Sequence, residues 1–217
     1  MHPLDAITRT AKRLIIMLEF NEEKHEYRWN GSIIDSTTQI LDAMGFISQY
    51  CKDEIAAANG TIGHKIMHLL LEDRLDNYDP AFELKMQSIK KFIADENPRF
   101  IGLEVMGSSS DKNPSHVGTL DFLGTINSWK ERIGILDWKF IKTFSKQTKL
   151  SAKLQTAGYV PIAQNVFNLD KKLKLKRAAV HITDKSYHIH NFNDDIDLIY
   201  FQSILNSFKL KKMYGFI

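Results

Sequence analysis

Three segments in the middle of the chain alternate between apolar and polar residues with a period of two: 100–106, 117–126 and 132–141. Such alternation is typical of half-buried β-strands. The intervening NSWKE predicts a turn that joins the last two into a hairpin. Two further strands, AAVHIT and SYHIHNF, are predicted around a turn at Asp184-Lys185.

A helical period appears after Asn59-Gly60, where apolar residues recur at Ile62, Ile66, Leu69, Leu70 and Leu75. We also expect helices over 48–59, 81–95, 147–167 and 194–213, the second ending before Pro98 and the third bending near Pro161. The core order is therefore α, β, β, β, α, β. This predicts an α/β (α+β) fold with helices packed on a mixed sheet.

The N-terminal part predicts a hairpin and a short helix. In HEYRW-Asn30-Gly31-SIID, the Asn-Gly pair suits a two-residue type I′ turn. Ser36 is expected to cap the helix TTQILDAMG, which Gly45 closes.

Length and composition narrow the class of protein. The 217 residues, 43% of them hydrophobic, predict a single domain over 1–217, divided into an N-terminal part (1–59), a core (60–183) and a C-terminal part (184–217). The apolar stretch from Leu14 to Leu18 is far shorter than the roughly 20 residues of a membrane span, and the start lacks the order of a secretory signal. The single cysteine, Cys51, excludes an internal disulfide and a cysteine zinc site, so we expect an intracellular, reducing compartment.

Positive charge is concentrated in one region. From Lys139 to Arg177 there are ten Lys or Arg and one acid, Asp170, although the net charge is only +3. Such a surface suits a phosphate backbone, but a solvated, lysine-rich helix and turn explains it as well. Four of the lysines are spaced to form a ridge that could follow a nucleic-acid strand: Lys142, Lys146, Lys149 and Lys153.

Acidic residues interrupt the apolar strands. Asp137 and Lys139 are two residues apart and so share a strand face, and a tight hairpin would place Asp121 beside Asp137. Two adjacent carboxylates repel each other unless a divalent cation such as Mg²⁺ or Mn²⁺ binds between them. Lys139 would then orient the attacking water. The alternative is an ordinary buried Asp–Lys pair.

Four other polar residues have open roles. Glu104 could ligate the metal or face solvent, and a helical histidine such as His64 is more often structural. The stretch from His64 to His68 lacks the glutamate of a zinc-protease motif, so we reject that class. Gln155 and Tyr159, one helical turn apart, could point at the same site or only support the structure.

Taken together, these motifs resemble the RecB-like branch of the PD-(D/E)XK nucleases, whose core is αβββαβ. The resemblance covers about residues 60 to 183 and rests on Gly60-Thr61-x-Gly63-His64, Glu104, Gly118-Thr119-Leu120-Asp121, Asp137-Trp138-Lys139 and Gln155-x-x-x-Tyr159. The N-terminal HEYRWNGSIIDSTTQIL is similar to the start of phage-encoded members, with Asp35 in place of a proline.

The resemblance implies a metal-dependent DNA nuclease, commonly an exonuclease, that acts in recombination, repair or phage DNA processing. It assigns the metal to His64, Asp121, Asp137 and the Trp138 carbonyl. Lys139 would assist the attacking water, and Gln155 and Tyr159 would support the site. Glu104 matches an acid often found on the first core strand. The expected cofactor is Mg²⁺ or Mn²⁺; a single cysteine excludes the iron–sulfur cluster of many relatives.

The expected partner is DNA, at ends or single-stranded stretches, together with recombination or replication proteins. Two alternatives remain open. One is a structure-specific endonuclease, and the other is a catalytically silent DNA-binding accessory protein that kept the fold.

Overall fold

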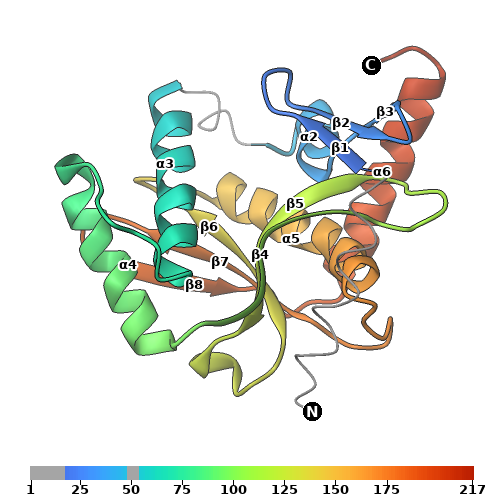
Figure 1. Ribbon diagram of the computed structural model, residues 1–217. Coiled ribbons are helices and arrows are strands. Elements are labelled where there is room, and N and C mark those ends of the chain that lie inside the picture. Colours follow the sequence, from blue (N-terminus) through green and yellow to red (C-terminus); the bar gives the residue numbers. More distant parts are fainter. Residues whose placement is uncertain (1–17, 48–53) are drawn as a thin grey trace.

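A five-stranded mixed sheet lies at the centre of the computed structural model, which describes residues 18–47 and 54–217 (Figure 1). The strand order is β4-β5-β6-β7-β8; β6 and β7 are parallel, and the other neighbours are antiparallel. The five strands predicted from the sequence are all present, and so is the mixed sheet. Their bounds are β4 (Arg99–Ser108), β5 (Val117–Thr125), β6 (Gly134–Lys139), β7 (Lys176–Ile182) and β8 (Tyr187–Asn191).

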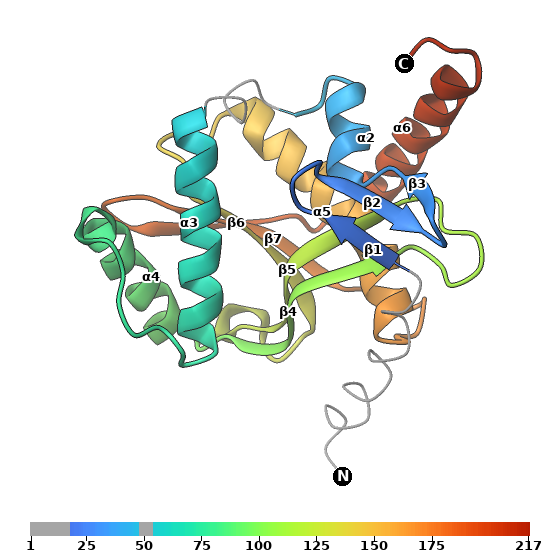
Figure 2. The ribbon, with the colours of Figure 1, turned by 45° about the horizontal axis from the view of Figure 1, so that its top comes forward.

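Helices cover both faces of this sheet (Figures 1 and 2). On one face, α3 (Glu54–Leu71) and α4 (Glu83–Glu96) bury apolar side chains that include Leu136 and Trp138 of β6. On the other face, α5 (Lys146–Val166) packs on Ile135, and α6 (Ile196–Met213) packs in turn on α5. The alternation along β6 therefore divides its residues between two cores, as the sequence predicted.

A smaller sheet, β1 (Leu18–Asn21), β2 (Glu26–Trp29) and β3 (Ser32–Ile34), precedes α2 (Thr37–Ala43). The predicted hairpin is confirmed, because Asn30 and Gly31 both have the positive φ, 49° and 78°, that a type I′ turn requires. The predicted cap is also confirmed: the Ser36 side chain accepts from the Gln39 amide, and the Gln39 side chain accepts from the Ser36 amide. Strand β1 was not predicted.

One prediction about the helices was wrong. Asn59-Gly60 does not separate two helices, because α3 runs through both residues; the predicted helix over 48–59 lies partly outside the described residues. A boundary at 59/60 therefore falls inside a helix. The helical cost of a glycine, about 1 kcal/mol, is outweighed here by the packing of α3 on the sheet.

Within residues 18–47 and 54–217, two of the turns between elements contain a short 3₁₀ helix. Pro80–Phe82 leads into α4, and Asn127–Trp129 forms part of the predicted turn between β5 and β6. Among the described residues, no helix has both the length and the apolar character needed to cross a bilayer.

Candidate metal and catalytic site

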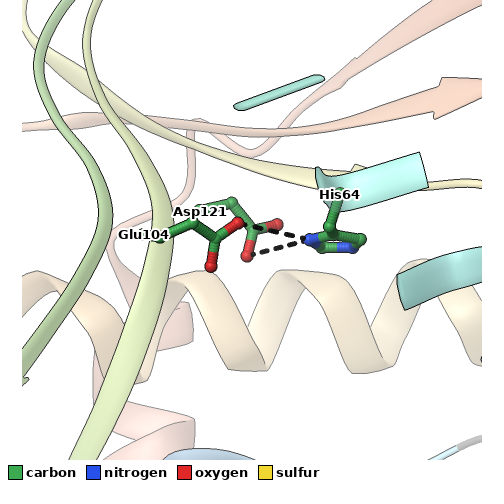
Figure 3. A group of neighbouring side chains, drawn as sticks. All are labelled: His64, Glu104 and Asp121. Carbon is green, nitrogen blue, oxygen red and sulfur yellow. Dashed lines mark ion pairs between the residues drawn. The ribbon is translucent and has the colours of Figure 1, made fainter. Parts of the chain in front are cut away.

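Three side chains from α3, β4 and β5 converge at one point (Figure 3). Nδ1 of His64 lies 3.5 Å from Oδ1 of Asp121 and 3.7 Å from Oε1 of Glu104. One ligand atom from each residue lies within 4.8 Å of the other two. This cluster, which we call the His64–Glu104–Asp121 group, joins two of the predicted metal and catalytic residues with the acid whose role the sequence left open.

Close packing positions His64. A Cβ on its neighbour Gly63 would lie 2.3 Å from the ring of Phe140, so α3 approaches the end of β6 at a distance that only glycine permits. The ring of Phe140 in turn lies 5.7 Å from that of His64, centroid to centroid. The glycine in the sequence pattern thus has a steric role in bringing the helix to the sheet.

Backbone geometry positions the two acids. Glu104 has a φ of +47°, an unusual conformation for a residue other than glycine inside a strand. The register on either side of it places Glu104 opposite Asp121. The Asp121 carboxylate is fixed by the Trp138 amide, which donates to Oδ2 at 2.7 Å. Strained backbone of this kind is concentrated at functional sites, which makes Glu104 a stronger candidate than its sequence alone suggested.

The charges in the group depend strongly on one another. Burial by itself lowers the pKa of His64, but the carboxylates of Asp121 and Glu104 outweigh it and raise that pKa to about 10. The pKa of Asp121 is below its usual value: burial alone would raise it, but the nearby charges of His64 and Lys139 and the bond from the Trp138 amide outweigh burial. His64 is therefore protonated beside the two carboxylates, and a metal ion would bind its ring nitrogen only by displacing that proton.

A second set of polar residues adjoins the group on the face covered by α5. Lys139 Nζ lies 2.7 Å from Oδ2 and donates at 2.9 Å to Oδ1 of Asp137, and it donates at 3.1 Å to Oε1 of Gln155. Gln155 Nε2 donates to the Tyr159 hydroxyl at 2.8 Å and to Thr38 Oγ1 at 3.4 Å. The predicted catalytic residues thus form one hydrogen-bonded chain from Asp137 to Tyr159.

Burial shifts two pKa values along this chain. It raises the pKa of Asp137 to about 6, even though Lys139 acts in the opposite direction. Burial and the charges of Asp121 and Asp137 raise the pKa of Tyr159 well above its usual value, so its hydroxyl keeps its proton. Lys139 and Asp137 are therefore held as a pair beside the metal-ligand candidates, and neither side chain is freely solvated.

The donor set of the His64–Glu104–Asp121 group suits a hard or borderline divalent cation. Two carboxylates and one imidazole match the ligands of Mn²⁺ and, with its preference for oxygen, Mg²⁺. Asp137 is not one of the three residues of this group, and its carboxylate pairs with Lys139; its part in metal binding stays a prediction. The Trp138 amide donates to Asp121, and its side chain packs against Phe92 and Phe122. That the Trp138 carbonyl ligates the metal stays a prediction.

A cleft of about 810 Å³ opens beside the group. One wall comes from the β1–β2 hairpin and the other from α3, with β4 and β5 at the base. Its lining residues are Phe20, Glu22, His25, Tyr27, Gly60, Thr61, His64, Lys65, His68, Leu69, Glu104 and Thr119. Two of the candidate metal ligands, His64 and Glu104, therefore line a space open to a substrate, while Asp121 lies buried behind them.

The predicted basic ridge is only partly formed. Lys142 lies in the loop before α5, whereas Lys146 and Lys149 are exposed on its first turns. Lys153 is half-buried and lies 2.8 Å from the buried Asp197, which Arg177 also contacts at 2.8 Å. Lys153 thus has a structural partner that the ridge hypothesis did not foresee, and the exposed charge lies nearer the N-terminus of the helix.

Sequence reasoning missed the part played by the N-terminal hairpin and α2. The Tyr27 hydroxyl pairs with Thr119 Oγ1 at 3.0 Å, two residues before Asp121, and Thr38 at the start of α2 accepts from Gln155. These contacts join residues far apart in the chain, so no local spacing could have revealed them. Together these hydrogen bonds connect the smaller sheet and α2 to the residues of the site.

Comparison with protein-family models gives no match. Comparison with curated proteins gives no match either.

Proposed function

We propose that this chain is a metal-dependent DNA nuclease of the RecB-like, PD-(D/E)XK type. The observation that carries the proposal is the junction of two sets of side chains: the His64–Glu104–Asp121 group and the Asp137–Lys139–Gln155 chain. The order α3, α4, β4, β5, β6, α5, β7 is compatible with the αβββαβ core of that class, with α4 as an additional helix between α3 and β4.

His64, Glu104 and Asp121 would hold the cation, with Asp137 next to them. When bound, Mg²⁺ or Mn²⁺ supplies Lewis-acid stabilisation of negative charge on a phosphoryl group and promotes the ionisation of water. The protein contributes the rest. The Trp138 amide fixes the direction of the Asp121 carboxylate, and Gln155 fixes the direction of the Lys139 ammonium.

The reaction is hydrolysis of a phosphodiester. A water oxygen forms a bond to phosphorus as the bond from phosphorus to the leaving sugar oxygen breaks, and one proton of the water ends on that leaving oxygen. The products are a phosphate monoester and a hydroxyl. Lys139 holds its positive charge where the attacking water and the developing phosphoryl charge meet.

Three exposed lysines follow β6 in the chain and support a polyanionic substrate: Lys142 in the loop before α5, and Lys146 and Lys149 on its first turns. We favour an exonuclease that acts in recombination, repair or phage DNA processing. A structure-specific endonuclease would use the same site. A silent DNA-binding accessory is disfavoured because both sets of side chains are complete.

The test is cleavage of linear and closed-circular DNA, single- and double-stranded, with Mg²⁺, with Mn²⁺ and with EDTA. We expect metal-dependent loss of linear DNA that spares circles and falls on the order of 10²–10³-fold in Lys139→Ala. Nicked or linearised circles would indicate an endonuclease. DNA binding without any cutting would support the accessory protein, and unchanged activity of folded Lys139→Ala would overturn the proposed site.

A further inference from the structure

An exposed aromatic side chain forms part of the cleft wall facing the candidate metal ligands. Phe20, on β1, is 37% exposed and lines the same cleft as His64 and Glu104. Single exposed apolar side chains are common on protein surfaces; what distinguishes Phe20 is its place in the cleft beside His64 and Glu104.

The ring of Phe20 is held in place by its neighbours. It packs against Tyr27, its cross-strand partner, at 4.5 Å between centroids, and His25 meets it edge-on at 5.3 Å. Tyr27 is buried, and its hydroxyl pairs with Thr119 on β5. The Phe20 platform, meaning Phe20 with Tyr27 and His25, is thereby fixed relative to Asp121.

The two walls of the cleft differ in chemistry. The hairpin wall carries the aromatic platform together with Glu22, a residue that repels phosphate. The α3 wall carries the exposed Lys65 and also His68, which is 3.3 Å from Glu72. A nucleotide chain in the cleft is therefore favoured with its phosphates toward α3 and its bases toward the hairpin.

We propose that Phe20 stacks on the base of an unpaired nucleotide beside the scissile phosphate, so that the substrate is single-stranded DNA. This inference rests on the proposed nuclease function. Every base has a π-face, and an aromatic ring binds it with little dependence on sequence. A base inside a duplex offers only its edges, because its faces are covered by its neighbours, so the platform selects unpaired strands.

Binding is measured first in EDTA, where the cation is absent, by anisotropy of labelled single- and double-stranded DNA of one sequence. We expect single strands to bind on the order of tenfold more tightly than the duplex. Phe20→Leu keeps an apolar side chain without the aromatic face and should lose on the order of tenfold in single-strand affinity. Phe20→Trp should retain the single-strand affinity of the wild type. The fluorescence of a 2-aminopurine base in the bound strand should be quenched by the wild type and much less by Phe20→Leu.

Ile33→Ala provides the matched control, since Ile33 is an exposed apolar residue on β3 of the same small sheet and does not line the cleft. It should bind like the wild type. The melting temperature of each variant is compared with that of the wild type, and an unchanged value shows that the variant still folds. Equal affinity for duplex and single strand, or wild-type affinity in Phe20→Leu, would overturn the inference.

Cleavage is measured separately on the same DNAs with Mg²⁺ or Mn²⁺. If DNA is cut without regard to strandedness and Phe20→Leu cuts normally, the stacking inference fails while the nuclease proposal stands. If nothing is cut but the binding results are as expected, the nuclease proposal fails and the Phe20 platform is a single-strand binding site.

Discussion

The Trp138 amide donates a 2.7 Å hydrogen bond to Oδ2 of Asp121, and Oδ1 of the same carboxylate lies 3.5 Å from Nδ1 of His64. A backbone group of β6 thus orients an acid of β5 toward a histidine of α3. The bond holds Oδ2 toward β6, and Oδ1 is the carboxylate oxygen nearest His64. The geometry of the site therefore depends on the pairing of the two strands.

Removing the charge of Asp121 while keeping its shape should abolish cation binding. Asp121→Asn retains an oxygen that can accept from the Trp138 amide, but it removes one of the two carboxylates of the group. A cation that binds the folded protein at 100 times its Kd stabilises it by about 2.7 kcal/mol. We expect Mn²⁺ to raise the melting temperature of the wild type and not that of Asp121→Asn.

Asp76→Asn serves as the control, because Asp76 is an exposed carboxylate outside the group. It should respond to Mn²⁺ as the wild type does. Retention of the full Mn²⁺ response in Asp121→Asn would show that the cation binds elsewhere.

Tyr159 is predicted to act by positioning Gln155. Its hydroxyl accepts from Gln155 Nε2 at 2.8 Å, and the opposite end of that amide accepts from Lys139 at 3.1 Å. Tyr159→Phe leaves the amide with one fewer partner, so we expect kcat for DNA cleavage to fall roughly fivefold, as about 1 kcal/mol of lost hydrogen bonding implies.

Steady-state kinetics distinguish this role from a general loss of structure. KM for DNA and the melting temperature should change much less than kcat. A large rise in KM with unchanged kcat would instead assign the Tyr159 hydroxyl to substrate binding.

The sequence predicted the framework of this fold because its signals are local. The signals for β5, β6, the Asn30-Gly31 turn and the Ser36 cap each lie within a few residues, and each of these features is confirmed. Both strands are, however, buried on both faces rather than on one. The convergence of His64 with Asp121 followed only from the resemblance, since no local rule joins a helix to a strand nearly 60 residues away.

The features that were missed depend on contacts between distant residues. Strand β1 has one buried residue, Leu18, followed by three exposed ones, so it has no alternation and is specified by pairing with β2. The positive φ of Glu104 could not be predicted, because a positive φ is expected mainly at glycine and this position is a glutamate. Lys153 could be assigned to its buried partner Asp197 only after α6 was placed on α5.

Two glycines of α3 should respond to alanine in opposite ways. A Cβ at Gly60 would meet nothing within 4 Å, so Gly60→Ala should stabilise the protein by about 0.5–1 kcal/mol through helix propensity. A Cβ at Gly63 would meet the Phe140 ring at 2.3 Å, so Gly63→Ala should destabilise by about 1–3 kcal/mol.

Urea denaturation of the two variants gives the free energies of unfolding. Phe140→Leu combined with Gly63→Ala tests the cause, because a smaller side chain should recover part of the loss caused by Gly63→Ala. Equal effects of alanine at both glycines would contradict the close approach of α3 to Phe140.

His116 should make the stability of the protein depend on pH. This side chain is buried, with Nε2 2.9 Å from the Gly158 carbonyl and Nδ1 3.0 Å from the Ser115 hydroxyl. Burial lowers the pKa of His116 to about 4, and the charge of Lys209 acts in the same direction, outweighing the bond to Gly158. The folded protein therefore holds His116 neutral at pH values where the unfolded chain, with a pKa near 6.5, takes up a proton.

The sign of the effect follows from this difference. The unfolded state binds more protons between about pH 6.5 and pH 4, so the free energy of unfolding should decrease as the pH falls through that range. The contribution of His116 is on the order of 2 kcal/mol between pH 7.5 and pH 5. His116→Gln can still donate to Gly158 but does not titrate, so its stability should fall less over this range. Urea denaturation at several pH values gives the free energy of unfolding of variant and wild type, and their difference isolates the contribution of His116. If the two free energies fell in parallel with pH, His116 would be protonated as readily in the folded state as in the unfolded one.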